Sequence, residues 1–188
     1  MTSSELEKLI RDRLSDAGLA AFLDDRTEQY LEFPDGFFAE VVLKDGSKLA
    51  EAQRVVKSVT EELGNRGIDL HVIVRAIWEV VAVESAGIVS GGFLRFRVTL
   101  RSGSRECTID VNVTGLALAE VLSAFRGGNL REYGSDQNTV LTGIVTKFVR
   151  LELSYGGEGS WDPLLRPELE LNEWALQYLT SPSPVKAG

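Results

Sequence analysis

Hydrophobic residues recur every three or four positions in two stretches of the first third of the chain. The first predicts a helix over residues 4–16, and Ser4 followed by Glu7 forms a capping-box pattern at its start. The second predicts a helix with Ser47 as N-cap that ends at Gly64. The apolar stripes are Leu6, Leu9, Ile10 and Leu14, and Leu49, Ala52, Val55, Val56, Val59 and Leu63.

Other stretches have the residue usage of strands. Residues 30–33 and 37–43 flank the turn signal at 34–36, which predicts a hairpin. Residues 68–84 are rich in Val and Ile and predict one long, buried strand through the middle of a sheet.

A second hairpin is predicted over residues 93–101 and 105–113. A two-residue loop at Ser102-Gly103 would pair residues whose numbers sum to 205. In that register Val98 and Cys107 face the core, while Arg95 and Asp110 meet on the outer face.

The region after this hairpin predicts further helices. Thr114 caps one that Gly127 ends. Residues 139–155 fit either a helix or a strand, and we place a helix up to about Lys147 and a strand after it.

The last part of the chain gives weaker patterns. Pro163 and Pro167 disfavour regular structure over residues 160–171. Asn172 caps a short helix, and residues 181–188 are expected to be a disordered tail.

These elements predict an α+β fold. We expect a mixed, mostly antiparallel sheet of five or six strands with helices on one face, built from a strand-helix-strand core and a β-hairpin. Residues 1–180 would form a single domain with its core at 37–126 and a docked C-terminal segment at 160–180.

Composition narrows the functional classes. The chain has 188 residues with one histidine and one cysteine, too few for a Cys/His metal cluster or a redox thiol pair. A lone cysteine and a polar, acidic start suggest the cytoplasm. The formal net charge of −8 disfavours nucleic acid and membrane surfaces as partners.

The sequence offers few candidates for catalytic residues. His71 is expected to be structural or merely exposed, and Cys107 an inert core thiol. Carboxylate pairs such as Asp24-Asp25 and Glu168 with Glu170 lie in charged stretches typical of solvated surface. No phosphate-binding glycine motif is present in the sequence. For these reasons together we assign no catalytic, metal or cofactor-binding residue and expect no cofactor.

The C-terminal stretch supplies the one candidate interface. Its aromatic and leucine residues would cover either the chain's own sheet or another protein. They are Trp161, Leu164, Leu165, Trp174 and Tyr178.

The resulting hypothesis is a non-enzymatic cytoplasmic protein-interaction module, such as an adaptor, an immunity-type inhibitor or a chaperone-like protein. The alternative is a small enzyme or ligand-binding protein that uses carboxylates and arginines. A homo-oligomeric component is the third possibility.

Overall fold

The computed structural model describes residues 1–25, 30–33, 36–89, 91–154 and 161–180. Its helices and strands confirm the α+β class. The strands form two sheets, of three and four strands, where the sequence predicted one sheet of five or six.

Contacts divide the chain into two compact units. The first contains residues 1–78 and the hairpin tip 101–106, and the second contains the other described residues. Whether the units fold as the one domain expected from chain length stays a prediction.

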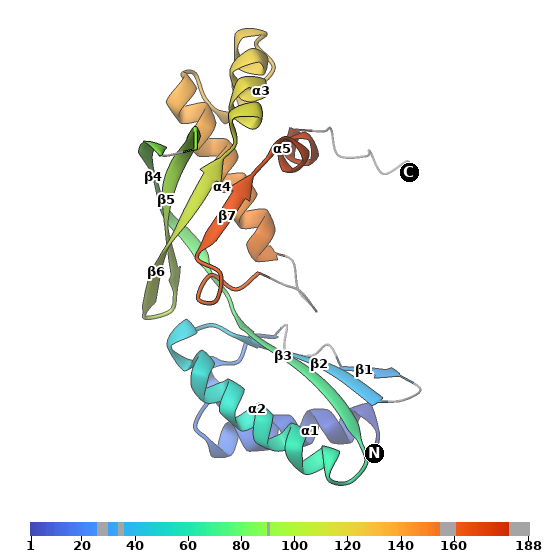
Figure 1. The fold of residues 1–188 in the computed structure, drawn as a ribbon. Helices are drawn as coiled ribbons and strands as arrows, with labels where there is room; N and C mark the ends of the chain where they lie inside the picture. The colour runs from blue at the N-terminus through green and yellow to red at the C-terminus, as the bar shows by residue number, and fades with distance from the viewer. Residues whose placement is uncertain (26–29, 34–35, 90, 155–160, 181–188) are drawn as a thin grey trace. The chain divides into compact units, whose positions relative to one another are not determined.

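The first unit is a three-stranded sheet with two helices. Strand β2 pairs antiparallel with β1 and parallel with β3, and α2 connects β2 to β3, so the predicted strand-helix-strand arrangement is confirmed. Both helices cover the same face of the sheet (Figure 1). The elements are α1 (Ser3–Asp16), β1 (Tyr30–Phe33), β2 (Gly36–Leu43), α2 (Leu49–Gly64) and β3 (Asp69–Ala76).

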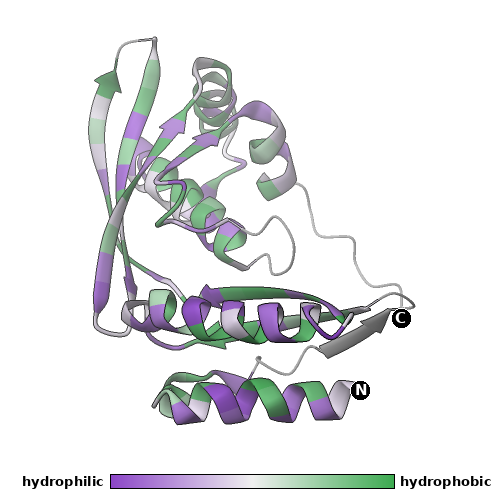
Figure 2. Ribbon diagram, turned by 60° about the horizontal axis from the view of Figure 1, so that its bottom comes forward, coloured by the Kyte–Doolittle hydropathy of each residue, from purple (hydrophilic) through white to green (hydrophobic). Residues whose placement is uncertain are grey.

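The predicted helical stripes form much of the core of this unit. Hydrophobic and hydrophilic residues alternate along both helices in Figure 2, as amphipathic helices require. Each fully buried aliphatic side chain contributes about 1.5–3 kcal/mol of transfer free energy. The buried residues include Leu6, Ile10 and Leu14 of α1, Ala52, Val56, Val59 and Leu63 of α2, and Ala39, Val41 and Leu43 of β2.

Both predicted N-caps of this unit are wrong. Helix α1 begins one residue earlier than expected, so Thr2 and Glu5 form the capping box in place of Ser4 and its partner. The Ser47 backbone N–H donates to the Asp45 carboxylate, and a 3₁₀ turn at Gly46–Lys48 precedes α2. In each case the side chain that accepts an unpaired backbone N–H at the start of the helical segment lies two residues before the predicted cap: Thr2 in the first case and Asp45 in the second.

The long strand predicted over 68–84 is also wrong, because the chain leaves one sheet for another within it. Strand β3 ends at Ala76 and β4 (Glu79–Val89) begins three residues later, each at the edge of its own sheet. The neighbouring strand β2 ends at Leu43, whose carbonyl accepts the Ile77 N–H at 2.8 Å. Beyond that bond β3 has no partner strand to extend along.

The second unit is a four-stranded sheet in the order β4-β5-β6-β7, with three helices. Helix α4 packs against β4 and against α3 and α5. The remaining elements are β5 (Phe93–Ser102), β6 (Arg105–Val113), α3 (Gly115–Arg126), α4 (Gln137–Ser154), β7 (Glu168–Leu171) and α5 (Glu173–Thr180).

The hairpin of β5 and β6 confirms the predicted faces but corrects the turn. The turn residues are Gly103 and Ser104, one position later than predicted. This shift moves the cross-strand partner of each residue by two positions. Because side chains alternate with a period of two, every residue stays on its predicted face. Arg95 forms its predicted outer ion pair with Asp110 at 3.2 Å. Cys107, next to the tip, is only partly buried.

The C-terminal third brings two corrections. Helix α4 continues through the predicted break at Lys147 to Ser154, so the strand expected there is wrong as far as the described residues extend. A strand, β7, forms directly after Pro167 and pairs parallel with β6. Pro167 is tolerated directly before this strand because only its carbonyl takes part in the pairing. That carbonyl accepts the Asp110 N–H at 2.8 Å, and the N–H that proline lacks is not required.

The two predicted caps in this unit are confirmed. The Thr114 hydroxyl accepts the Ala117 N–H at 3.2 Å, and the Asn172 side chain accepts the Ala175 N–H at 3.0 Å. The predicted tail at 181–188 lies outside the described residues.

Candidate functional site

The five residues of the predicted interface fall into two groups. Trp161 is 8% exposed and its indole N–H donates to the Arg166 carbonyl at 2.8 Å, so it belongs to the core of its own unit. Leu164 is half-buried. The other three are exposed: Leu165 at 77%, Trp174 at 76% and Tyr178 at 64%.

Trp174 and Tyr178 lie one turn apart on α5, so they share one side of this helix. We call these two residues the aromatic face. A large apolar side chain left in water forgoes its transfer free energy, and Trp and Tyr are the residue types most enriched at the centres of protein interfaces. The aromatic face is therefore the strongest candidate docking surface among the predicted residues.

Helix α5 is held at both ends and along its other side. Leu176 and Leu179 are each 4% exposed, and Asn172 caps the first turn. At the C-terminal end the Lys147 ammonium donates to the Leu179 carbonyl at 2.8 Å and to the Tyr133 hydroxyl at 2.8 Å. A cation at this end also interacts favourably with the helix dipole, so the helix presents its aromatic face in a fixed orientation.

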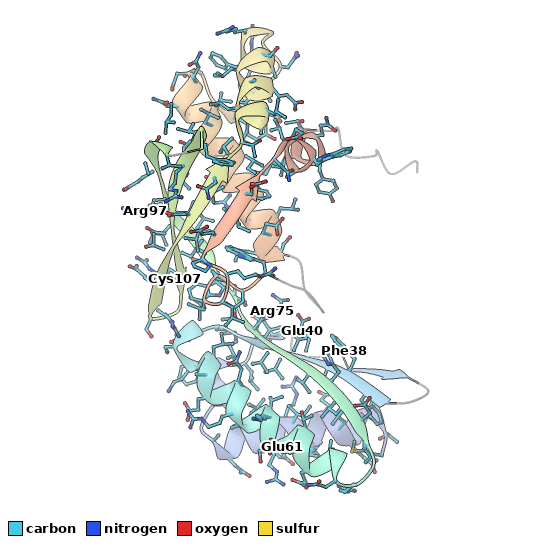
Figure 3. All side chains as sticks on the ribbon, viewed as in Figure 1. Phe38, Glu40, Glu61, Arg75, Arg97 and Cys107 are labelled. Atoms are coloured by element: carbon cyan, nitrogen blue, oxygen red, sulfur yellow. The ribbon has the colours of Figure 1, made fainter. Side chains whose placement is uncertain are left out.

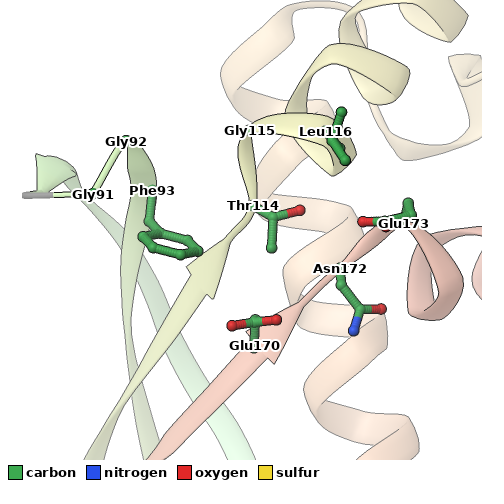
Figure 4. Close-up of a pocket in the computed structure, with 9 residues that line it drawn as sticks. All are labelled: Gly91, Gly92, Phe93, Thr114, Gly115, Leu116, Glu170, Asn172 and Glu173. Carbon is green, nitrogen blue, oxygen red and sulfur yellow. The ribbon is translucent and has the colours of Figure 1, made fainter.

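A pocket of about 570 Å³ lies in the same unit, at the start of α5. Figure 4 shows the Phe93 ring and the Glu170 and Glu173 carboxylates directed into this space from β5, β7 and α5. The lining residues are Gly91, Gly92, Phe93, Thr114, Gly115, Leu116, Glu170, Asn172 and Glu173.

The charge of the pocket is negative. Glu170 and Glu173 are the acidic residues among those that line it, and none of the described side chains forms an ion pair or hydrogen bond with either carboxylate. The pocket and the aromatic face adjoin along the chain, since Glu173 lines the pocket and Trp174 follows it.

The sequence did not predict this pocket. Glu170 was placed in an irregular segment, and only the pairing of β7 with β6 brings it to the same end of the sheet as Thr114 and Phe93. One sequence feature could have pointed to this place. Gly91-Gly92 precede the predicted strand 93–101 and Thr114-Gly115 follow the predicted strand 105–113, so these small residues meet at one end of the hairpin.

Among the sequence candidates for acid-base and metal chemistry, Glu170 lines the pocket, whereas His71 belongs to the first unit. His71 is exposed and stacks on Phe38, with ring centroids 5.8 Å apart. Glu40, only 3% exposed, accepts a hydrogen bond from Arg75 on the sheet face that carries Phe38 (Figure 3). Within the described residues no group of three or more His, Cys, Asp and Glu residues could hold a metal ion.

Comparisons of the chain with protein-family models, curated proteins and solved structures found no match. None of the helices in the described part of the chain combines the length and apolar character needed to cross a membrane.

Proposed function

We propose that this chain is a non-enzymatic protein-interaction module that binds its partner through the aromatic face of α5. The observation that carries the proposal is the exposure of Trp174 and Tyr178, 76% and 64%, on a helix whose opposite side is already buried. The two side chains are not needed to cover the unit's own core, since Leu176 and Leu179 do so.

The fixed position of α5 supports this assignment. A docking helix that is ordered before binding loses less conformational entropy when the partner arrives. Two aromatic anchors one turn apart suit a groove on a folded protein, the mode in which helices bind grooves. The single cysteine is compatible with the cytoplasm as the place of action.

A second candidate function is small-ligand binding or carboxylate-based catalysis. The pocket favours it, because Glu170 and Glu173 converge there beside Phe93. Its volume of about 570 Å³ falls within the usual range for ligand sites. Loss of a measured turnover in the Glu170→Gln variant would favour this candidate over the interaction module.

The test is site-specific photo-crosslinking in the producing cells. The photoreactive residue p-benzoylphenylalanine replaces Tyr178 in one variant and Ile88 in a matched control, since Ile88 is an apolar residue of the same unit that is 78% exposed. We expect a discrete crosslinked product from position 178 only. Adding Trp174→Ala to that variant should lower its yield about tenfold, as loss of an interface anchor does.

Three outcomes would contradict the proposal. They are no product at position 178, equal products at both positions, and a yield that Trp174→Ala leaves unchanged. A product of twice the chain mass would identify a second copy as the partner and favour the homo-oligomeric alternative.

A further inference from the structure

The pocket beside the aromatic face has the chemistry of a site for a cation. Its two carboxylates, Glu170 and Glu173, have no partner among the described residues. The nearest guanidinium along the same strand as Phe93 belongs to Arg95. That group is already engaged, at 3.2 Å from the Asp110 carboxylate and 2.9 Å from the Asn112 side-chain oxygen.

Two helices begin at the pocket, and a helix N-terminus alone would favour an anion. Here the N-caps already accept N–H groups of the first turns, Thr114 from Ala117 at 3.2 Å and Asn172 from Ala175 at 3.0 Å. Glu173 adds a negative charge in the first turn of α5. Both features reduce the attraction for an anion and leave a net negative pocket.

Phe93 adds a preference among cations. Its half-buried ring faces the space that the two carboxylates share (Figure 4). An aromatic face attracts a cation, and a planar guanidinium can stack on a ring while it donates to carboxylates in its own plane. Leu116, 66% exposed, lines the rim and offers apolar surface for an alkyl stem.

We propose that this pocket receives an arginine side chain of the protein partner, so that the partner's binding segment is basic and carries an apolar groove or residue next to that arginine. The guanidinium lies against Phe93 and donates to Glu170 and Glu173, while the adjoining apolar surface covers Trp174. This inference rests on the proposed function and names the chemistry of the partner.

The experiment uses a single-residue probe and needs no partner. The ¹⁵N-labelled full chain is titrated with N-acetyl-arginine N′-methylamide and, in parallel, with the citrulline analogue, which has a similar shape and no charge. We expect amide shift changes confined to the pocket, at Gly92, Gly115 and Glu173 among others, and an affinity for the arginine probe about tenfold higher, in line with charged hydrogen bonds and a cation-π contact.

Variants then assign the effect. The double variant Glu170→Gln with Glu173→Gln should lose the preference for arginine. Glu168→Gln should retain it, because Glu168 lies on the same face of β7 two residues away and does not line the pocket. Equal affinity for both probes, unchanged preference in the double variant, or shifts outside the pocket would each overturn the inference.

This result is separable from the test of the proposed function. If the probe binds as expected but crosslinking from position 178 fails, the pocket takes a guanidinium and the interaction module is refuted. If crosslinking succeeds but the probes do not differ, the partner docks on the aromatic face and the arginine assignment is refuted.

Discussion

The two sides of α5 predict opposite consequences for stability and binding. Leu176→Ala removes a side chain that is 4% exposed, so it loses transfer free energy and leaves a cavity. The cost for such a buried leucine is about 2–5 kcal/mol. Trp174→Ala removes a side chain that is 76% exposed, and surface substitutions of this kind change stability by about 0.5 kcal/mol or less.

The assay is urea unfolding followed by far-ultraviolet circular dichroism, with the two variants and the unaltered chain side by side. We expect Leu176→Ala to lower the unfolding free energy of the second unit by about 3 kcal/mol at an unchanged dependence on urea. Trp174→Ala should leave the transition in place, and it should lower the yield of the crosslink from position 178 about tenfold.

A cost below about 1 kcal/mol for Leu176→Ala would contradict the docking of α5 on its unit, since truncating a buried leucine normally costs more. A large cost for Trp174→Ala would equally contradict the assigned role of the aromatic face. That result would mean that the exposed ring supports the fold and is not reserved for a partner.

Two further predictions concern the hairpin tip of the first unit and the segment before α2 that it contacts. Ser102→Ala should lower the unfolding free energy by about 1–3 kcal/mol in the same assay, because the Gly46 N–H that donates to the buried Ser102 hydroxyl at 2.9 Å would lose its acceptor. Ser58→Ala, an exposed serine of α2, is the matched control, and equal costs for the two would contradict the prediction. The Ser47 backbone N–H lowers the pKa of the Asp45 carboxyl, so the stability from this group is present above its unfolded pKa of about 4 and is lost as the pH falls through the lower folded value. Unfolding free energy measured from pH 5 to pH 2 should therefore fall less steeply in Asp45→Asn, and an unchanged slope would contradict the stated cause.

Sequence patterns correctly predicted the helices and strands whose structure follows from their own residues. The stripe of α2 and the alternation of β5 and β6 each place several large apolar residues on one face, and those faces are the ones buried. The hairpin turn was misplaced by one residue because Ser102-Gly103 and Gly103-Ser104 are both acceptable turn sequences. The parity of the strands is the same for either turn, so the pattern alone did not distinguish them.

The predictions failed where the structure of a segment depends on another segment that is distant in the sequence. Strand β3 ends because β2 ends, and four-residue β7 exists because β6 offers it an edge beside Asp110. Neither partner is visible in a local window of the sequence. The pocket depends on β7, so Glu170 could not be assigned a neighbour before the strand order was known.

Helix α5 shows how a local pattern can still point to a partner. At about 100° per residue, Trp174 and Tyr178 centre on a direction about 150° away from that of Leu176 and Leu179. A helix that is apolar on two opposite sides needs two surfaces to cover it. The structure provides one surface, over Leu176 and Leu179, and leaves the aromatic side in water. The second apolar side, together with the carboxylates of Glu170 and Glu173 in the adjoining pocket, is the reason why we propose a basic protein surface as the complement.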